Sequence, residues 1–354
     1  MSGFHKLSVK NITRETDASV SISFNIPENL KEEFRFKAGQ YITLKTEIDG
    51  DEVRRDYSLC ASPKSGEVKV AVKEVKDGTF SAYANNNLNV GDSLDVAHPR
   101  GRFIFEPNDK KTKNIALFAA GSGITPIMSI IKCALEEEVN SKVILVYGNK
   151  STKDTMFLQK LLELQHQYNE RFSIQFVFSQ TDEDDAIFGR IEKSTVNYVM
   201  KNKHKHIEVD AYYLCGPEGM IHTVKDVLSE HGIDETRVHF ELFKAAKPEE
   251  IKGDTPATTA SEKIKITVVV DDEETVFEMS AKQTILEAAL DEDLDAPYSC
   301  QGGICSSCLA RIKEGEATMM QNNILTESEV AEGLILTCQA KPTTPTIVVD
   351  YDDV

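Results

Sequence analysis

Several features that would point to familiar classes of protein are scarce or missing in this sequence. No apolar run approaches the roughly 18 residues that a membrane-crossing helix requires, so we expect no membrane span. The first residues, Met1-Ser-Gly-Phe-His-Lys, hold no apolar stretch typical of a secretion signal, and we therefore expect a cytoplasmic protein. Basic side chains are outnumbered: the formal net charge is −18, which argues against nucleic-acid binding.

The acidic excess is concentrated near the end of the chain. Residues 263–354 hold eighteen acidic and six basic side chains, a net charge of −12. This segment forms either a solvated acidic surface or a docking face for a basic partner, and the sequence favours neither interpretation.

Cysteine, not histidine, supplies the candidate metal ligands. None of the eight histidines has the spacing of metal ligands. Four of the seven cysteines have the spacing C-x4-C-x2-C-x29-C, the plant-type pattern for a [2Fe–2S] cluster: Cys300, Cys305, Cys308 and Cys338. Two disulfides would need an oxidising compartment, and zinc sites usually pair separated C-x2-C units, so the cluster is favoured over both. Gly302 and Gly303 suit a tight loop around an inorganic core.

The pattern of apolar residues predicts three domains and a linker. Short strand-like runs separated by turns predict an antiparallel β-barrel in residues 1–107, and short buried strands alternating with helices predict a parallel α/β sheet in residues 112–243. Residues 244–262 lack a hydrophobic period and are interpreted as a linker. In residues 263–354, a predicted hairpin, a helix with Thr284 as its N-cap and a closing strand suit a β-grasp ferredoxin domain.

Two glycine-containing turns in the α/β domain are candidate nucleotide sites. Gly121-Ser-Gly123-Ile-Thr125-Pro126 follows one predicted strand, and Cys215-Gly216-Pro217 follows another; each opens a helix. Helix N-termini favour phosphate, and both turns should lie at the carboxyl edge of the sheet, where ligands bind. The first turn lacks the full G-x-G-x-x-G fingerprint because Pro126 takes the third position, and taken alone it could be a merely tight turn. Cys215 could equally be a simple buried thiol.

The predicted barrel carries Arg55-Asp-Tyr57-Ser58 and Gly78-Thr-Phe-Ser81. In isolation these would be ordinary surface and turn residues. Together with the two turns, in this order, they resemble the ferredoxin–NADP reductase superfamily, and the C-terminal plant-type ferredoxin extends the resemblance over all 354 residues. Within the superfamily the chain is most similar to the reductase subunits of phenylacetyl-CoA epoxidases, through Gly315-Glu-Ala-Thr-Met319, Asn323-Ile-Leu-Thr and the segment from Glu332 to Cys338.

The resemblance implies a role for each motif. Tyr57 would stack on the flavin of FAD, Arg55 would pair with its pyrophosphate, Ser58 would hydrogen-bond near flavin N5, and Gly78 and Ser81 would hold the pyrophosphate from the other side. The nicotinamide coenzyme would be received by Gly121, Gly123, Thr125 and Pro126, with Cys215, Gly216 and Pro217 near the nicotinamide. Tyr57, Ser58 and Cys215 would thus surround the reacting rings.

The coenzyme is expected to be NADPH by resemblance, with NADH as a competitor. Gln180 stands where related members tend to have an arginine for the 2′-phosphate, and Asn149-Lys150 keeps a charge but not a bidentate fork. Lys153 could help, whereas the acidic run 182–185 would oppose a 2′-phosphate if it lay close.

The expected activity is electron transfer from NAD(P)H through FAD and the [2Fe–2S] cluster to an oxygenase, favoured as a diiron enzyme that epoxidises phenylacetyl-CoA. One alternative keeps this electron path but serves another monooxygenase, a ring-hydroxylating dioxygenase, or a general ferredoxin or flavodoxin. An alternative of a different class is a tethered ferredoxin, acting as a carrier or redox-sensing module beside a vestigial flavin site; the intact Arg55, Tyr57 and Ser58 speak against it.

Overall fold

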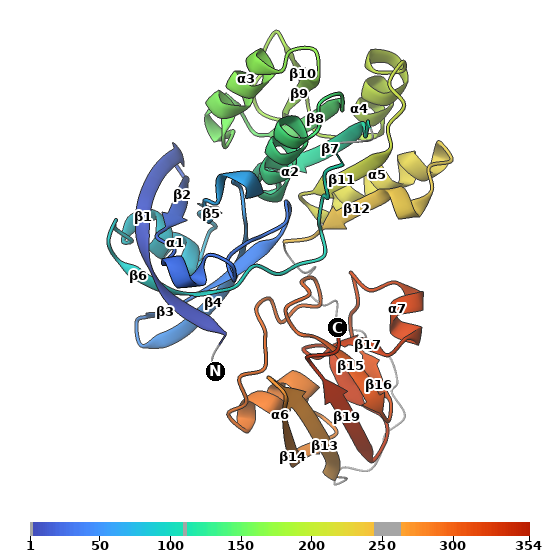
Figure 1. The fold of residues 1–354 in the computed structure, drawn as a ribbon. Coiled ribbons are helices and arrows are strands. Elements are labelled where there is room, and N and C mark those ends of the chain that lie inside the picture. Colours follow the sequence, from blue (N-terminus) through green and yellow to red (C-terminus); the bar gives the residue numbers. More distant parts are fainter. Residues whose placement is uncertain (1–2, 109–111, 244–262) are drawn as a thin grey trace. The chain divides into compact units, whose positions relative to one another are not determined.

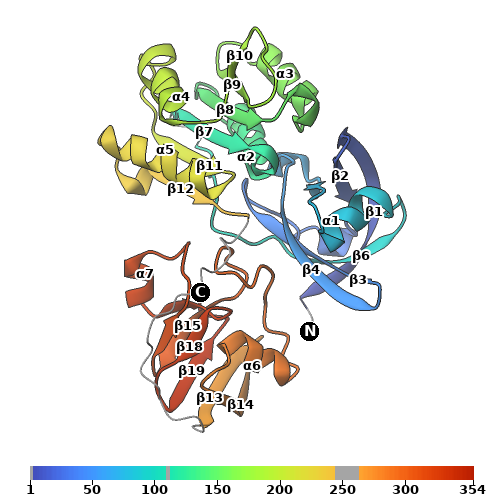
Figure 2. The same cartoon turned by 180° about the vertical axis from the view of Figure 1, so that it is seen from behind.

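The computed structural model describes residues 3–108, 112–243 and 263–354 (Figures 1 and 2). Its described residues divide into two compact units, one within Phe4–Phe243 and the other formed by residues 263–354. The expected linker, residues 244–262, lies outside the described residues. No helix in the described parts of the chain is long and apolar enough to cross a membrane.

The first part of the larger unit is an antiparallel barrel, as the sequence predicts. Its strands pair in the order β4-β3-β6-β1-β2-β5, and a bridge between Leu59 and Val70 joins the two outer strands, which closes the sheet. Helix α1 adds Phe80 and Ala84 to the core. The elements are β1 Phe4–Thr16, β2 Ser19–Phe24, β3 Tyr41–Ile48, β4 Asp51–Ser58, β5 Lys69–Lys73, β6 Ser93–Ala97 and α1 Thr79–Asn86, with 3-10 turns at Glu28–Leu30 and Pro63–Ser65.

The second part is a six-stranded parallel sheet in the order β10-β9-β8-β7-β11-β12. The strand order reverses between β7 and β11, so the carboxyl ends of these neighbours form the crevice where open α/β sheets bind ligands. Its strands are β7 Ile115–Ala120, β8 Val143–Asn149, β9 Phe172–Phe178, β10 Ala186–Phe188, β11 Ala211–Cys215 and β12 Val238–Glu241. Its helices are α2 Ile124–Glu137, α3 Leu158–Gln167, α4 Lys193–Asn197, a π-helix Tyr198–Lys203 and α5 Glu218–Glu230, with 3-10 turns at Gly121–Gly123, Thr152–Asp154 and Glu235–Arg237.

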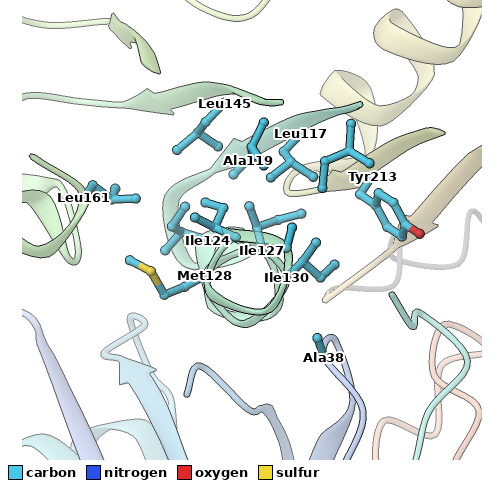
Figure 3. Packing of buried hydrophobic residues seen from close by; sticks show 14 of the residues in the cluster. Ala38, Leu117, Ala119, Ile124, Ile127, Met128, Ile130, Leu145, Leu161 and Tyr213 are labelled. Atoms are coloured by element: carbon cyan, nitrogen blue, oxygen red, sulfur yellow. The ribbon is translucent and has the colours of Figure 1, made fainter. Parts of the chain in front are cut away.

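A continuous hydrophobic core joins the barrel to the parallel sheet. Eleven of the fourteen residues of α2 are buried, because the helix packs on the sheet with one side and on the barrel with another. Figure 3 shows Ile127 and Ile130 of α2 between Leu117 of the sheet and Ala38 of the barrel, all members of one cluster. Because cores of this kind are close-packed, the two domains form one body.

Hydrogen bonds along α2 strengthen this junction. Ser129, Lys132 and Glu136 each bond to the segment 60–62 that follows β4, and we call this set the interdomain contact. Ser129 Oγ donates to the carbonyl of Ala61 at 2.7 Å, and Lys132 Nζ donates to the carbonyl of Cys60 at 2.9 Å. Glu136 Oε2 accepts a hydrogen bond from the hydroxyl of Ser62 at 2.5 Å. The middle and last turns of α2 are thereby tied to the segment that follows β4.

The smaller unit is the predicted β-grasp domain. Its main sheet has the order β14-β13-β19-β15-β17, and β16 pairs with β18 beside it. Thr284 is the N-cap of α6, as predicted: its hydroxyl accepts from the backbone of Glu287 at 3.2 Å, and Glu287 Oε2 accepts from Thr284 N at 2.8 Å. The elements are β13 Lys263–Val270, β14 Glu273–Ser280, α6 Ile285–Asp291, β15 Leu309–Glu314, β16 Ala317–Met319, α7 Glu327–Ala331, β17 Leu334–Leu336, β18 Ala340–Pro342 and β19 Thr346–Asp350.

The interdomain contact predicts a specific loss of stability. Ser129→Ala leaves a buried carbonyl unpaired, which should cost about 1–2 kcal/mol, so the melting temperature should fall by several degrees. Ser229→Ala, at an exposed serine of α5, is the matched control and should melt like the parent protein. Circular dichroism during heating measures both; equal melting temperatures for the two variants would show that the contact adds nothing.

Candidate functional site

The two glycine-containing turns meet at the carboxyl edge of the parallel sheet. Gly121–Gly123 forms a 3-10 turn between β7 and α2, and Thr125 Oγ1 donates to the Ser122 carbonyl at 3.0 Å within it. A Cβ on Gly123 would lie 2.1 Å from the carbonyl oxygen of Cys215, so only glycine allows this approach. Both Thr125 and Pro126 are buried at the start of α2, and Pro217 precedes α5. The structure therefore brings these predicted residues together.

Two half-buried side chains at the same edge of the sheet have buried polar atoms. Among the residues that the structure describes, neither the oxygen nor the nitrogen of the Asn149 amide has a hydrogen-bond partner, and nor does the Thr181 hydroxyl. Asn149 ends β8, and Thr181 follows β9, so both lie at the ligand-binding edge of the sheet. Buried polar groups are normally paired, and a bound nucleotide is the kind of ligand that would satisfy these.

A lysine of the barrel also faces the first turn, and the sequence did not single it out. Lys73, the last residue of β5, places Nζ 4.0 Å from where a Cβ on Gly121 would lie. Loss of solvent lowers its pKa, while the charge of Asp154 opposes this. No carboxylate in the described residues lies within ion-pair distance of it. A half-buried, unpaired ammonium beside a helix N-terminus suits a phosphate.

The predicted flavin residues of the barrel include an aromatic ring, at Tyr57, and a tight glycine turn, at Gly78. Tyr57 is half-buried near the end of β4 and lies against the ring of Phe80 in α1, with centroids 5.3 Å apart. Gly78 precedes α1, and a Cβ there would lie 2.4 Å from Ser81 Oγ. Arg55 stays exposed, with Nη1 donating to the carbonyl of the preceding residue at 2.6 Å, so its guanidinium has no anionic partner in the described residues. These features fit an aromatic ring with a pyrophosphate.

Ser58, Cys215 and Glu241 form a cluster where the two domains meet. Ser58 Oγ, at the end of β4, donates to Glu241 Oε2 at 3.2 Å. Glu241 ends β12 and pairs in register with Cys215 at the end of β11. Burial raises the pKa of Glu241 to about 8, against a smaller lowering effect of the Ser58 hydrogen bond. Burial also raises the pKa of Cys215 well above its usual range, so both groups are protonated at neutral pH.

Glu241 was missed by reasoning from sequence alone. The only signal that could have identified it is a single carboxylate at the end of the short run Val238–Phe240. Lys73 gave the same kind of signal, since it ends the apolar run Val70–Val72. In each case the partner came from the other domain, which no local pattern shows.

The four predicted cluster ligands lie in two pairs in the smaller unit. The sulfur atoms of Cys300 and Cys305 are 3.0 Å apart, and the thiols of Cys308 and Cys338 contact each other. Nowhere in the described ranges do three His, Cys, Asp or Glu side chains converge as a mononuclear ion would require. Two thiol pairs instead fit two irons with two thiolates each.

The loop around Cys300 favours its thiolate form. The Cys305 thiol and the backbone N–H groups of Gly302, Ile304 and Cys305 lower the pKa of Cys300 to about 5, against its burial. Gln301 and Gly303 both have positive φ, of 49° and 69°, which turns the loop around the site. The predicted [2Fe–2S] cluster therefore fits the residues present.

The raised pKa of Glu241 predicts a pH-dependent stability difference. Because its folded pKa of about 8 exceeds the ordinary 4.5, the native state keeps a proton that the unfolded chain releases between these values. Glutamate should thus destabilise the fold increasingly as pH rises through this window. We expect Glu241→Gln to melt like the parent protein below pH 4.5 and at a higher temperature by pH 8, in cofactor-free protein. A melting difference that does not change with pH would contradict the assignment.

Family models match each of the three parts of the chain. The oxidoreductase FAD-binding domain matches residues 6–105, the oxidoreductase NAD-binding domain residues 117–226, and the 2Fe-2S iron-sulfur cluster binding domain residues 268–343. These matches support FAD, a nicotinamide coenzyme and a [2Fe–2S] cluster as the cofactors.

Relatives match this chain over nearly the full length of both chains. One subunit of the 1,2-phenylacetyl-CoA epoxidase of Escherichia coli (strain K12) is 35% identical over 99% of each chain. The ferredoxin reductase component of the 3-ketosteroid-9-alpha-monooxygenase of Rhodococcus rhodochrous is 31% identical over 98% of this chain and 96% of its own. The solved structure of phthalate dioxygenase reductase is 26% identical, covers 98% of both chains and superposes with a TM-score of 0.60. This chain belongs to the oxygenase reductases of the ferredoxin–NADP reductase superfamily that carry a C-terminal [2Fe–2S] ferredoxin domain, and it passes electrons from a nicotinamide coenzyme through FAD to that cluster.

Proposed function

We propose that this chain is the reductase that supplies electrons to a diiron oxygenase which epoxidises phenylacetyl-CoA. The observation that carries this proposal is the 35% identity to the epoxidase component over 99% of both chains, with no domain gained or lost between them. The reaction would take place in the cytoplasm, where reduced nicotinamide coenzymes are supplied. A ketosteroid monooxygenase is the second candidate acceptor, because its reductase component is nearly as similar, at 31%.

On the flavin side, five residues would hold FAD. Arg55 would bind the pyrophosphate, since its exposed guanidinium has a fork that matches phosphate oxygens. Tyr57 would pack its ring on the flavin, and Ser58 would donate a hydrogen bond at its reactive edge. Gly78 and Ser81 would receive phosphate at the start of α1. When bound, FAD accepts two electrons as a hydride and releases them one at a time, which is the only way a [2Fe–2S] cluster can take them.

On the coenzyme side, the two turns would orient the hydride donor. Gly121, Gly123, Thr125 and Pro126 would receive the pyrophosphate at the start of α2, with the ammonium of Lys73 across from it. Gly216 and Pro217 would border the nicotinamide beside Cys215. The protonated Cys215 and Glu241 would keep negative charge away from the flavin, which favours arrival of the hydride because the flavin gains negative charge as it is reduced.

The adenosine end of the coenzyme site carries mixed charge. Lys150 is exposed beside Asn149 and could attract a 2′-phosphate, which supports NADPH. Glu183 of the acidic run, however, accepts a hydrogen bond from Thr152 at 3.5 Å. Negative charge therefore lies next to the segment after β8 that carries Lys150. We propose NADPH as the coenzyme, and this contact favours NADH as the second candidate.

Reconstitution with separate oxygenases tests the proposed acceptor. The purified reductase would be mixed with the oxygenase component of a phenylacetyl-CoA epoxidase or of a ketosteroid 9α-monooxygenase, with NADPH or NADH. We expect coupled product formation at least tenfold faster with the epoxidase. Equal or faster turnover with the ketosteroid enzyme would transfer the proposal to that acceptor, and the ratio of kcat/KM for the two coenzymes decides between NADPH and NADH.

Loss of a cluster ligand tests the order of electron transfer. Cys305→Ser should lose the [2Fe–2S] absorbance and nearly all NAD(P)H-driven cytochrome c reduction, while ferricyanide reduction, which flavin can perform directly, should be largely kept. Cys133→Ser, at a buried cysteine of α2 outside the cluster, is the control and should keep both activities. Equal loss of both activities in Cys305→Ser would contradict flavin as the earlier carrier.

A further inference from the structure

A short turn of the ferredoxin domain packs on the cluster loop. Residues 320–325 lie between β16 and α7, and the backbone N–H of Asn323 donates to the Gly303 carbonyl at 3.3 Å. A Cβ on Gly303 would lie 2.9 Å from the carbonyl oxygen of Gln321, so the turn and the loop touch directly. Gly303 in turn hydrogen-bonds through its backbone to the thiol of Cys338. The turn is therefore one residue removed from a cluster ligand.

Two adjacent asparagines in this turn differ in the hydrogen bonds that their side chains make. The amide of Asn322 is fully used: Nδ2 donates to the Leu325 carbonyl at 2.9 Å, and Oδ1 accepts from Leu325 N at 2.8 Å. Asn323 Nδ2 is buried and has no hydrogen-bond partner within the described residues. A buried amide donor without a partner is rare and unfavourable, because it has lost water and gained nothing.

The other polar groups described close to Cys338 already make hydrogen bonds. Gln339 Nε2 donates to the Gln301 carbonyl at 2.9 Å and lies 3.7 Å from Cys338 Sγ. The Gly303 carbonyl accepts from the Asn323 backbone itself. The acceptors missing from this neighbourhood are those that the cluster would bring, namely its sulfur atoms, which carry negative charge and accept N–H hydrogen bonds.

We propose that the Asn323 side-chain amide donates a hydrogen bond to a sulfur of the [2Fe–2S] centre and so raises its reduction potential. The reduced cluster carries one more negative charge than the oxidised one, so a donor stabilises it more. Asn323 is then a tuning residue that helps the cluster to draw electrons from the flavin. The proposal rests on the cluster and is independent of which oxygenase receives the electrons.

The test is the midpoint potential of the cluster in the full-length holoprotein, followed by electron paramagnetic resonance of the reduced form. Asn323→Leu removes the donor at similar volume. We expect the cluster to be about tenfold less reduced at a fixed ambient potential, which corresponds to 59 mV for one electron, with a changed resonance signal. Asn323→Gln, which keeps an amide donor, should recover part of the shift.

Two controls separate the donor from the turn that carries it. Gln283→Leu removes a half-buried amide just before α6, outside both the cluster loop and the 320–325 turn, and should leave the potential unchanged. Asn322→Ala weakens the turn and should lower the melting temperature without a comparable shift in potential. An unchanged potential in Asn323→Leu, or an equal shift in Asn322→Ala, would overturn the proposal.

If Asn323→Leu fails to hold its cluster, Asn323→Asp decides instead. This variant keeps the shape and replaces the donor with a carboxylate, so we expect a larger shift to negative potential with iron retained. Loss of iron from both variants would also overturn the proposal, because a tuning residue is dispensable for assembly.

Discussion

Helix α2 begins at the Gly121–Gly123 turn, the proposed site of the nicotinamide coenzyme, and its side bonds to the segment that follows β4, the strand that carries the proposed flavin residues. Through Ser129, Lys132 and Glu136 the relative position of the two substrate-binding elements is set by one rigid helix. Hydride transfer requires the reacting atoms of the two rings to lie about 3–3.5 Å apart, and a misplacement of about 1 Å is costly to the rate. The rest of the reductase unit depends on this contact, because Ser58 reaches Glu241 only when both domains are held in place.

Along the proposed electron path, the charge of the described residues suits the step proposed at each point. The phosphates of FAD and of the coenzyme would meet Arg55 and Lys73, which have no carboxylate partner within the described residues. Near the proposed position of the reacting rings, burial instead keeps Cys215 and Glu241 neutral. Around Cys300, backbone N–H groups favour the thiolate that iron needs. These three environments would suit anion binding, hydride transfer and one-electron storage.

Much of the fold could be predicted from the sequence, because its signals are local. The strands Lys263–Val270 and Thr346–Asp350 and the N-cap Thr284 lie where apolar alternation and capping chemistry predict them. The barrel strand β4 was not predicted as a strand: Asp51–Ser58 is rich in charge, and only its pairing with β3 makes it extended. Strand β12 was missed for a similar reason, since it is only half-buried at the edge of its sheet.

Some residues of the candidate site could likewise be predicted from the sequence, and others could not. Motif residues such as Tyr57, Gly123 and the four cysteines could be found because their spacing along the chain carries the information. Lys73, Glu241 and Asn323 could not, since each acquires its meaning from a neighbour distant in sequence. For Asn323 that neighbour is Gly303, which lies 20 residues away in the cluster loop.

Anaerobic rapid mixing of the oxidised holoprotein with NADPH or NADH tests the central claim, the order of the electron path. Flavin and [2Fe–2S] absorbance would be followed separately in the same mixture. Flavin absorbance should fall first, at a rate that depends on coenzyme concentration, and cluster absorbance should follow at a rate that does not. Reduction of the cluster before the flavin, or of the cluster in protein stripped of FAD, would contradict this account.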